Sequence, residues 1–255
     1  MSEITLFRGE SHSNILLQNL GTSGLAVQAN HHLIVHNGEC ILLDPGGHAV
    51  FQRLFEDTAV MSGGAQIRHL FLSHQDPDIV SGINDWLRAT DALAYVSLLW
   101  LRFIPHVEIE EQFEHRLRAI PDEGMWLDLN GSELALIPAH FLHSAGNFHL
   151  YDPTSKILYT GDVGASLGCE YREVPDFEDH VPFMSGFHKR YMASSLALKT
   201  WVKLVRTLDI EVIAPQHGAL FRGREMVTQF LNWCETLRCG VDRLPECYEL
   251  PPRPL

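Results

Sequence analysis

The segment Leu70-Phe71-Leu72-Ser73-His74-Gln75-Asp76-Pro77-Asp78 decides the fold, because an apolar run leads directly into three potential metal ligands. The apolar start has the composition of a buried strand. In an extended loop, residues two positions apart point to the same side, so His74, Asp76 and Asp78 face one direction. Pro77 keeps Asp76 out of the helical conformation, which favours this geometry. Two carboxylates this close repel each other unless a cation lies between them, so the segment predicts a metal site.

A plainer interpretation is that these acidic residues cap the helix that follows. Asp78 suits that role, because an aspartate at a helix N-terminus accepts hydrogen bonds from free backbone N–H groups. The cap interpretation leaves His74 and Asp76 without a purpose. The metal interpretation gives all three residues a role.

Three further apolar runs end in the same way. The run 134–137 leads to His140 and His143, the run 157–159 leads to Asp162, and the run 212–214 leads to His217. Strand ends are rigid, and the turns beyond them can converge on one point. The sequence therefore predicts four turns that assemble one site, with either His140 or His143 as the second histidine.

Three histidines and three aspartates without cysteine suit two metal ions that share a bridging carboxylate. Structural zinc favours cysteine-rich tetrahedra, and calcium and magnesium favour oxygen ligands alone. A mixed His/carboxylate set with open positions suits redox-active iron, with manganese or zinc as alternatives.

Composition excludes several classes of partner. The chain has 255 residues with 19 Lys+Arg against 32 Asp+Glu, a net charge of −13. Such a surface repels nucleic acids and anionic membranes, so we expect neither as a partner. No stretch approaches the roughly 18 apolar residues that span a bilayer, and the start lacks a signal-peptide pattern. The five cysteines form no CxxC pair, and we expect reduced thiols in the cytoplasm, including Cys234, Cys239 and Cys247.

Strand-like runs occur in both halves of the chain. Asn37-Gly38, between the runs 33–35 and 41–43, predicts a tight hairpin. Helical spacing of apolar residues predicts helices over 79–87, 198–208 and 227–234, whereas 102–122 fits either a helix or an excursion. We expect an α+β fold in which two mixed β-sheets form a sandwich with outer helices. We expect one domain over 1–255, with 245–255 as a proline-rich surface tail.

The order of these ligands resembles the metallo-β-lactamase fold, an αβ/βα sandwich with a dinuclear site at one edge. The zinc hydrolases of that fold carry His-x-His-x-Asp-His in the first loop. Here the second histidine is Asp76, and Ile79 follows Asp78. A carboxylate at the first of these positions is typical of the flavodiiron branch, whose motif is His-x-Glu-x-Asp.

The resemblance to flavodiiron proteins extends along nearly the whole chain. It includes the segments 28–34 and 187–218. His143 and Asp162 are 19 positions apart (162 − 143), as the resemblance leads us to expect. Asp162 and His217 are 55 apart (217 − 162), near the slightly longer gap of the flavodiiron family. Two departures stand out, because Ile79 replaces a potential ligand and no flavodoxin-like domain with FMN follows. In both respects the chain is similar to the stand-alone oxygen-binding diiron proteins.

The resemblance implies the ligand set. One iron would take His74, Asp76 and His143, the other would take Asp78 and His217, and Asp162 would bridge them, with an oxo or hydroxo group between the irons. The 19-position gap favours His143 over His140. His31, His32, Asn147 and His149 are candidates for supporting hydrogen bonds or plain structural residues.

The resemblance also implies a function. It is a non-haem diiron protein that binds dioxygen as a sensor or signalling module, with a chemotaxis receptor or an electron-donor protein as a partner and a homodimer left open. Without a tethered flavin, oxygen binding should dominate over reduction. Three alternatives remain: an oxygen or nitric oxide reductase fed by a separate flavoprotein, a dinuclear zinc hydrolase, and a metal-free interaction module. Asp76 argues against the hydrolase, because its added negative charge weakens the Lewis acid.

Overall fold

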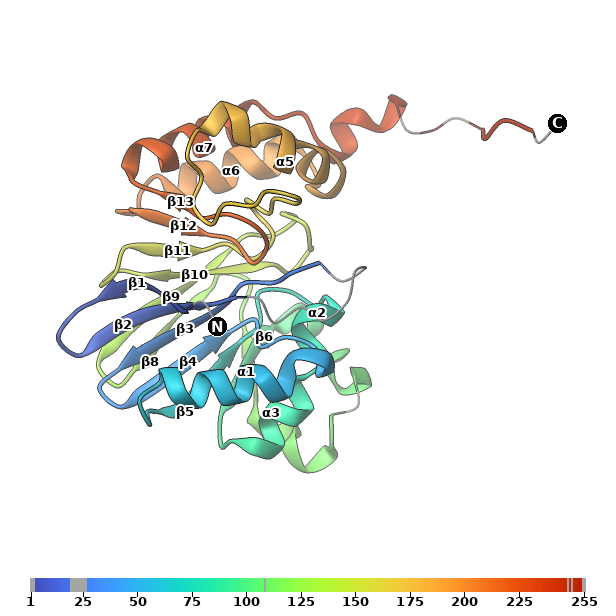
Figure 1. Cartoon of the computed structure of the whole chain (residues 1–255). Helices are drawn as coiled ribbons and strands as arrows, with labels where there is room; N and C mark the ends of the chain where they lie inside the picture. The colour runs from blue at the N-terminus through green and yellow to red at the C-terminus, as the bar shows by residue number, and fades with distance from the viewer. Residues whose placement is uncertain (1–2, 19–26, 108, 247, 249, 254–255) are drawn as a thin grey trace.

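Two β-sheets lie face to face at the centre of the molecule, and helices cover both outer surfaces (Figure 1). This description rests on a computed structural model, which describes residues 3–18, 27–107, 109–246, 248 and 250–253. One sheet has seven strands and the other has six. Both sheets contain parallel and antiparallel pairs, so the expected α+β sandwich of two mixed sheets is confirmed.

The first sheet follows chain order from β1 to β7. Its strands are β1 (Glu3–Arg8), β2 (His12–Leu17), β3 (His31–His36), β4 (Glu39–Leu43), β5 (Gln66–Phe71), β6 (Leu93–Ser97) and β7 (Leu117–Ile120). The first four strands are antiparallel, and the rest are parallel. Asn37 and Gly38 join β3 to β4 with φ values of 46° and 83°, which confirms the predicted tight hairpin.

The second sheet has the order β13-β12-β11-β10-β9-β8. Its strands are β8 (Met125–Leu129), β9 (Ser132–Pro138), β10 (Phe148–Asp152), β11 (Ile157–Tyr159), β12 (Val212–Ala214) and β13 (Phe221–Arg222). Only β11 and β12 are parallel within it. The connection between these two parallel strands contains two helices.

The helices occupy the outer surfaces of the two sheets. They are α1 (His48–Met61), α2 (Pro77–Val80), α3 (Ile83–Ala89), α4 (Leu98–Leu101), α5 (Phe177–Tyr191), α6 (Ser195–Val205) and α7 (Arg224–Thr236), with short 3-10 helices η1 (Ile104–Val107), η2 (Glu111–Arg116) and η3 (Gly240–Glu246). Figure 1 shows α1 and α3 over the first sheet and α5, α6 and α7 beside the second. Three apolar clusters result, one between the sheets and one under each helical layer.

A buried polar network also joins the sheets. Asp152 of β10 accepts hydrogen bonds at Oδ2 from His12 Nε2 and Asn14 Nδ2, each at 2.8 Å. Ser155 Oγ donates to the same oxygen over 2.6 Å, and Asn14 also donates to the hydroxyl of Tyr159. Because Asp152 is fully buried, this network supplies the partners that a carboxylate needs away from water.

The predicted helix over 79–87 forms as two short helices instead of one. A break occurs at Ser81-Gly82, where a Cβ on Gly82 would lie 2.6 Å from the carbonyl oxygen of Gly46. The close approach of the 46–47 segment therefore ends α2 after one turn. The helices predicted over 198–208 and 227–234 are confirmed as α6 and α7, and 102–122 contains η1, η2 and β7.

The C-terminal region departs slightly from the expected tail. The helix η3 continues to Glu246, and beyond it Tyr248 and Leu250 are exposed. Cys247 lies outside the described residues, whereas Cys234 and Cys239 are buried free thiols. In the described part of the chain, no helix is long and apolar enough to cross a membrane.

Candidate metal centre

Four turns at one edge of the sandwich carry the predicted ligands. They follow β5, β9, β11 and β12, the strands that the sequence predicts to end in histidine or aspartate. Hydrogen bonds tie the turns together, because Phe148 N donates to Ser73 O and Gln216 N donates to Gly161 O. Residues that are more than 140 positions apart in the chain therefore meet at one place.

Four of the six residues form one compact group. His74, Asp76, His143 and Asp162 each offer a ligand atom, and these atoms all lie within 4.8 Å of one another. His143 Nε2 lies 2.9 Å from Asp76 Oδ2 and 3.3 Å from Asp162 Oδ2. His74 Nε2 lies 3.7 Å from Asp76 Oδ2 and 3.8 Å from Asp162 Oδ2. Two imidazole nitrogens and two carboxylates thus point at a common centre.

The other two residues lie on the far side of Asp162. His217 Nε2 is 3.5 Å from Asp162 Oδ1 and 3.3 Å from Asp78 Oδ2. The two oxygens of Asp162 therefore face different histidines. Asp162 Oδ1 is buried and accepts no hydrogen bond from the described residues. A bridging carboxylate between two cations would have this arrangement.

Burial and charge differ across the site. The side chain of His74 is 2% exposed and that of Asp162 is 8% exposed, whereas that of Asp78 is 47% exposed. Burial alone would lower the pKa of His217, but the contact with Asp78 and the charge of Asp162 outweigh it and raise the pKa to about 9. The hydrogen bond from His143 and the nearby His74 imidazole lower the pKa of Asp76 well below its ordinary value. Asp76 is therefore charged at neutral pH, and the Asp78 side of the site faces solvent.

Hydrogen bonds behind the site fix two of the histidines. His74 Nδ1 lies 2.9 Å from Ser73 Oγ, which donates to Asp44 Oδ2 over 3.0 Å. His217 Nδ1 donates to the carbonyl oxygen of Gln28 over 2.9 Å. With Nδ1 engaged in this way, both rings direct Nε2 at the site, which is the usual way to orient a metal-binding imidazole.

Asp44 and Ser73 are supporting residues that the sequence analysis missed. Asp44 is buried, which raises its pKa to about 6, and Ser73 N donates to its Oδ1. The signal was present, since Asp44 directly follows the run 41–43 just as the candidate ligands follow theirs. Its partner lies 29 positions away, so the pairing itself could not be predicted.

The structure places His143 and His140 in different surroundings. His143 belongs to the compact group and has φ of 76°, a left-handed conformation that is rare for a residue with a side chain. His140 points elsewhere, and its Nε2 donates to the carbonyl oxygen of Asp122 over 2.8 Å. Asn147 donates to Leu142 O over 2.7 Å, which holds the backbone next to His143.

The remaining candidate residues lie around the site. His31 Nδ1 donates to Asp44 O over 2.7 Å, and burial lowers the pKa of His31 to about 4. His32 packs against Tyr159, with ring centres 4.8 Å apart. His149 accepts a hydrogen bond from Trp201 Nε1 over 3.1 Å. Ile79 is fully buried in the apolar cluster under the first sheet's helices, so it offers no ligand.

The donor set fits metal ions better than it fits an empty polar pocket. Three carboxylates meet three imidazoles, and most of the contacts between them are longer than a hydrogen bond. Like-charged carboxylates at this separation are costly unless a cation lies between them. Three His and three Asp without Cys match iron, manganese or zinc. Arranged on both sides of Asp162, they can hold two such ions.

Solved structures and sequence relatives match this architecture. A structure described as the peroxy diiron species of the chemotaxis sensor ODP is 42% identical, with a TM-score of 0.86, and covers 97% of this chain and 100% of that one. The apo state of the chemotaxis sensor ODP from T. denticola is also 42% identical, with a TM-score of 0.83, over 97% of this chain and 99% of that one.

More distant matches are larger proteins. A putative diflavin flavoprotein from Nostoc sp. (strain PCC 7120) is 24% identical over 83% of this chain, which spans 38% of that protein's length. A flavo di-iron protein variant from Thermotoga maritima is 15% identical with a TM-score of 0.73, over 92% of this chain and 60% of that one, a likeness that shows the fold alone. The family model described as ODP family beta lactamase matches residues 27–218. This chain belongs to that family, the ODP family of the beta-lactamase fold.

Proposed function

We propose that this protein binds dioxygen at a non-haem diiron centre and acts as an oxygen sensor. One observation carries the proposal. Two groups of candidate ligands meet at Asp162, in a chain that is 42% identical to a chemotaxis sensor whose structure is described as a peroxy diiron species. Iron supplies the electrons that reversible oxygen binding requires, when it is bound. The residues of this chain provide the site, its charge and its access to solvent.

We propose a ligand assignment that the distances support. His74, Asp76 and His143 would hold one iron, Asp78 and His217 would hold the other, and Asp162 would be shared. The three carboxylates offset part of the positive charge of an iron pair, which stabilises its oxidised form. The half-exposed Asp78 would leave an ion held by Asp78 and His217 the more accessible to small molecules.

Supporting residues keep the site rigid before metal binds. The Asp44-Ser73-His74 series and the His217–Gln28 bond fix two imidazole rings. A preformed ligand set lowers the cost of ordering when metal binds. The same hydrogen bonds would hold the His74 and His217 rings in place after metal is bound.

We also propose partners and a location for this protein. A sensor in this family would pass its state to a chemotaxis receptor, and we propose such a receptor as a partner. An electron-donor protein is the partner if the protein is instead a reductase, as the distant similarity to diflavin flavoproteins suggests. We further propose a cytoplasmic location, a single domain over 1–255 and, as for many soluble proteins, assembly into a homodimer.

Metal analysis and spectroscopy test the function together. Protein reconstituted with ferrous iron under argon should bind two irons per chain and be nearly colourless. Admission of air should produce an absorption band in the visible or near-ultraviolet, which reverses on removal of oxygen. Steady oxygen consumption with an added flavoprotein donor would indicate the reductase instead. Tight binding of zinc with no response to air would support the hydrolase.

A further inference from the structure

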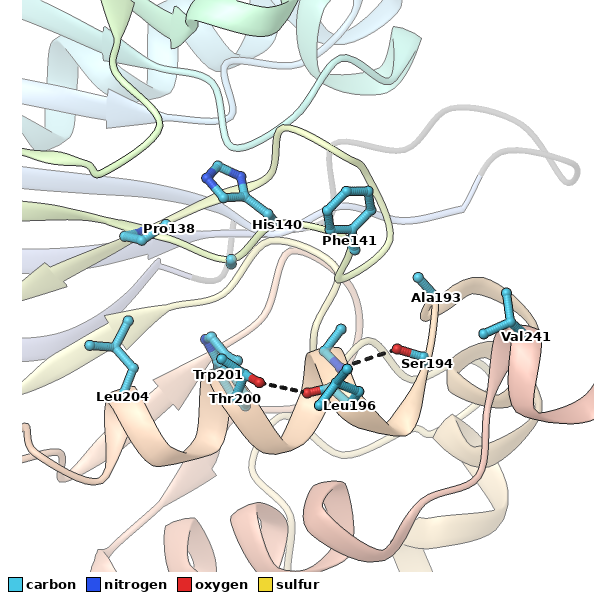
Figure 2. A pocket seen from close by; sticks show the side chains of 12 residues that line it. Pro138, His140, Phe141, Ala193, Ser194, Leu196, Thr200, Trp201, Leu204 and Val241 are labelled. Atoms are coloured by element: carbon cyan, nitrogen blue, oxygen red, sulfur yellow. Dashed lines mark hydrogen bonds between the residues drawn. The ribbon is translucent and has the colours of Figure 1, made fainter.

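An apolar groove lies between helix α6 and the loop that carries His143. Its volume is about 540 Å³, and its lining residues are Pro138, Ala139, His140, Phe141, Ala193, Ser194, Leu196, Ala197, Thr200, Trp201, Leu204 and Val241. Figure 2 shows Pro138, His140 and Phe141 on one wall, facing Leu196, Thr200 and Leu204 on the other. The candidate metal centre uses none of these side chains.

Several large apolar side chains in this groove are open to solvent. Leu196 is 72% exposed, Val241 is 58% exposed and Phe141 is 56% exposed. A continuous exposed apolar patch is costly in water and commonly marks a binding surface. Backbone hydrogen bonds hold the groove in shape, since Ala193 N donates to Phe141 O and Val241 N donates to Ala193 O.

Basic residues lie beside the groove on the α6 side. The segment 180–208 contains five Lys or Arg and no Asp or Glu, although the whole chain has a net charge of −13. Lys199 and Lys203 are exposed on α6, and neither forms an ion pair with a described residue. Arg206 differs, because it pairs with Glu235. On the opposite wall the acidic residue Asp122 lies beyond His140, and Asp242, next to Val241, accepts a hydrogen bond from Ser195 N at the start of α6. The positive charge of Lys199 and Lys203 therefore lies farther along α6.

We propose that this groove receives an acidic amphipathic helix of a partner protein. Apolar side chains on one face of that helix would enter the groove, and carboxylates beside them would pair with Lys199 and Lys203. An amphipathic helix places apolar residues at helical spacing against a groove, and Leu196 and Leu204 offer apolar contacts at i and i+8. Thr200 lies between them, and its hydroxyl donates to the carbonyl oxygen of Leu196. Complementary charge on the rim sets the choice of partner and the rate of encounter.

The groove is also connected to the metal centre. Phe141 lines the groove, and two residues later His143 joins the ligand group. Both residues have left-handed backbone conformations, with φ of 65° and 76°. Leu142 between them pairs with Met192, just before α6. A helix that contacts Phe141 would therefore affect a constrained loop that also positions His143. By thermodynamic linkage, iron binding would change the affinity of the groove for the helix by the same factor.

This link rests on the proposed function, because it makes the groove the output surface of the oxygen sensor. The groove itself can be tested without iron. A fluorescein-labelled 18-residue peptide with Leu at i, i+4 and i+8 and Glu on both flanks is the probe, and a peptide with Lys in place of every Glu is its control. Fluorescence anisotropy should show that the full-length metal-free protein binds the Glu peptide at least about tenfold more tightly at low salt. The difference should shrink at high salt because exposed charges are screened.

Matched variants locate the binding surface. Leu196→Ser should weaken binding of the Glu peptide about tenfold. Val60→Ser on α1 should not, although Val60 is similarly exposed at 66%. The double variant Lys199→Glu/Lys203→Glu should reverse the preference between the two peptides. Arg8→Glu/Arg53→Glu, two exposed basic residues of the other sheet and its helix, should leave the preference unchanged.

The outcomes separate this proposal from the proposed function. No binding, equal binding of both peptides, or binding that survives Leu196→Ser overturns the groove proposal, whatever the iron does. Co-sedimentation with phosphatidylserine vesicles that the Glu peptide does not prevent would assign the basic face to a membrane and also overturn it. Glu-peptide affinity that differs between anaerobic and aerated iron-loaded protein supports the link to His143. Equal affinity in those two states overturns the link, while the absorption band on aeration reports separately on oxygen binding.

Discussion

Asp162 Oδ1 lies 3.5 Å from His217 Nε2, while its other carboxylate oxygen faces His143 and His74. One aspartate thus stands between two half-sites that come from different turns. Asp162 follows β11, at the centre of the second sheet and parallel to β12, which leads to His217. The short parallel pair is what brings these two side chains to the same edge.

The shared position of Asp162 predicts that Asp162→Asn disrupts both half-sites at once. An amide is a weaker metal ligand and removes one of three negative charges. Iron content after anaerobic loading should fall from two per chain to one or fewer, and the band on aeration should be lost. Asp85→Asn, which removes a carboxylate that contacts His48 and Arg88 outside the site, is the control and should retain full iron content. Retention of two irons by Asp162→Asn would exclude a bridging role.

The contact between Asp78 and His217 predicts a pH effect in the metal-free protein. The pKa of His217 is about 9 when folded against an ordinary value of 6.5, so the folded state binds the proton more tightly. The resulting stabilisation is fully present below about pH 6.5 and is lost as the pH rises towards 9. An NMR titration of the His217 ring should show a midpoint near 9.

In Asp78→Asn that midpoint should fall, because the main partner that favours the charged imidazole is removed. Iron must displace the same proton, so iron affinity of the native protein should rise with pH across this range. A midpoint that is unchanged by Asp78→Asn would show that the two side chains do not interact in solution.

Gly218 directly follows His217, and its replacement by alanine should strongly destabilise the protein and disturb the site. A Cβ at Gly218 would lie 2.0 Å from Ser166 Oγ and 2.4 Å from Ser166 O, and φ is +82°. Gly168 has the same φ, but a Cβ there meets nothing within 4 Å. Gly168→Ala should therefore cost about 1 kcal/mol from backbone strain, and Gly218→Ala about 2–4 kcal/mol with loss of iron.

Urea unfolding of the metal-free variants, with iron content measured in parallel, checks this difference. Equal destabilisation by the two substitutions would mean that the close approach to Ser166 is absent in solution.

The polar network between the sheets predicts that Asp152 is important for stability. Asp152→Ala leaves His12, Asn14 and Ser155 with buried groups that have lost an acceptor. We expect a loss of about 3–5 kcal/mol in the free energy of unfolding. Asp209→Ala removes a half-exposed aspartate that pairs with Lys156 and Arg224, and should cost far less, because exposed ion pairs contribute little to stability. Denaturant unfolding curves for the two variants should be clearly separated, and coincident curves would contradict the prediction.

The parts of the site that the sequence predicts are those encoded locally. Each candidate ligand directly follows a strand, and the alternation of His74, Asp76 and Asp78 requires only an extended loop. The resemblance to flavodiiron proteins favoured His143, and the structure places that residue in the ligand group and His140 outside it. The parallel pairing that brings the turns together is not visible in any single segment.

The parts that the sequence missed depend on distant contacts. Asp44 gains its role from Ser73, and α2 ends early because Gly82 approaches Gly46. The groove has the same origin, since its walls come from the loop at 138–141, from α6 and from Val241. Periodicity predicts α6 well, but it does not tell which side chains remain exposed after folding.

Resonance Raman spectroscopy of the iron-loaded protein, prepared under argon and then exposed to ordinary or heavy-isotope dioxygen, tests oxygen binding at this centre most directly. The predicted result is a vibration that shifts with the isotope of the dissolved gas, disappears on removal of oxygen and is absent from Asp162→Asn. A spectrum insensitive to the isotope of the gas, from protein that nevertheless holds two irons, would contradict oxygen binding by the six assigned ligands.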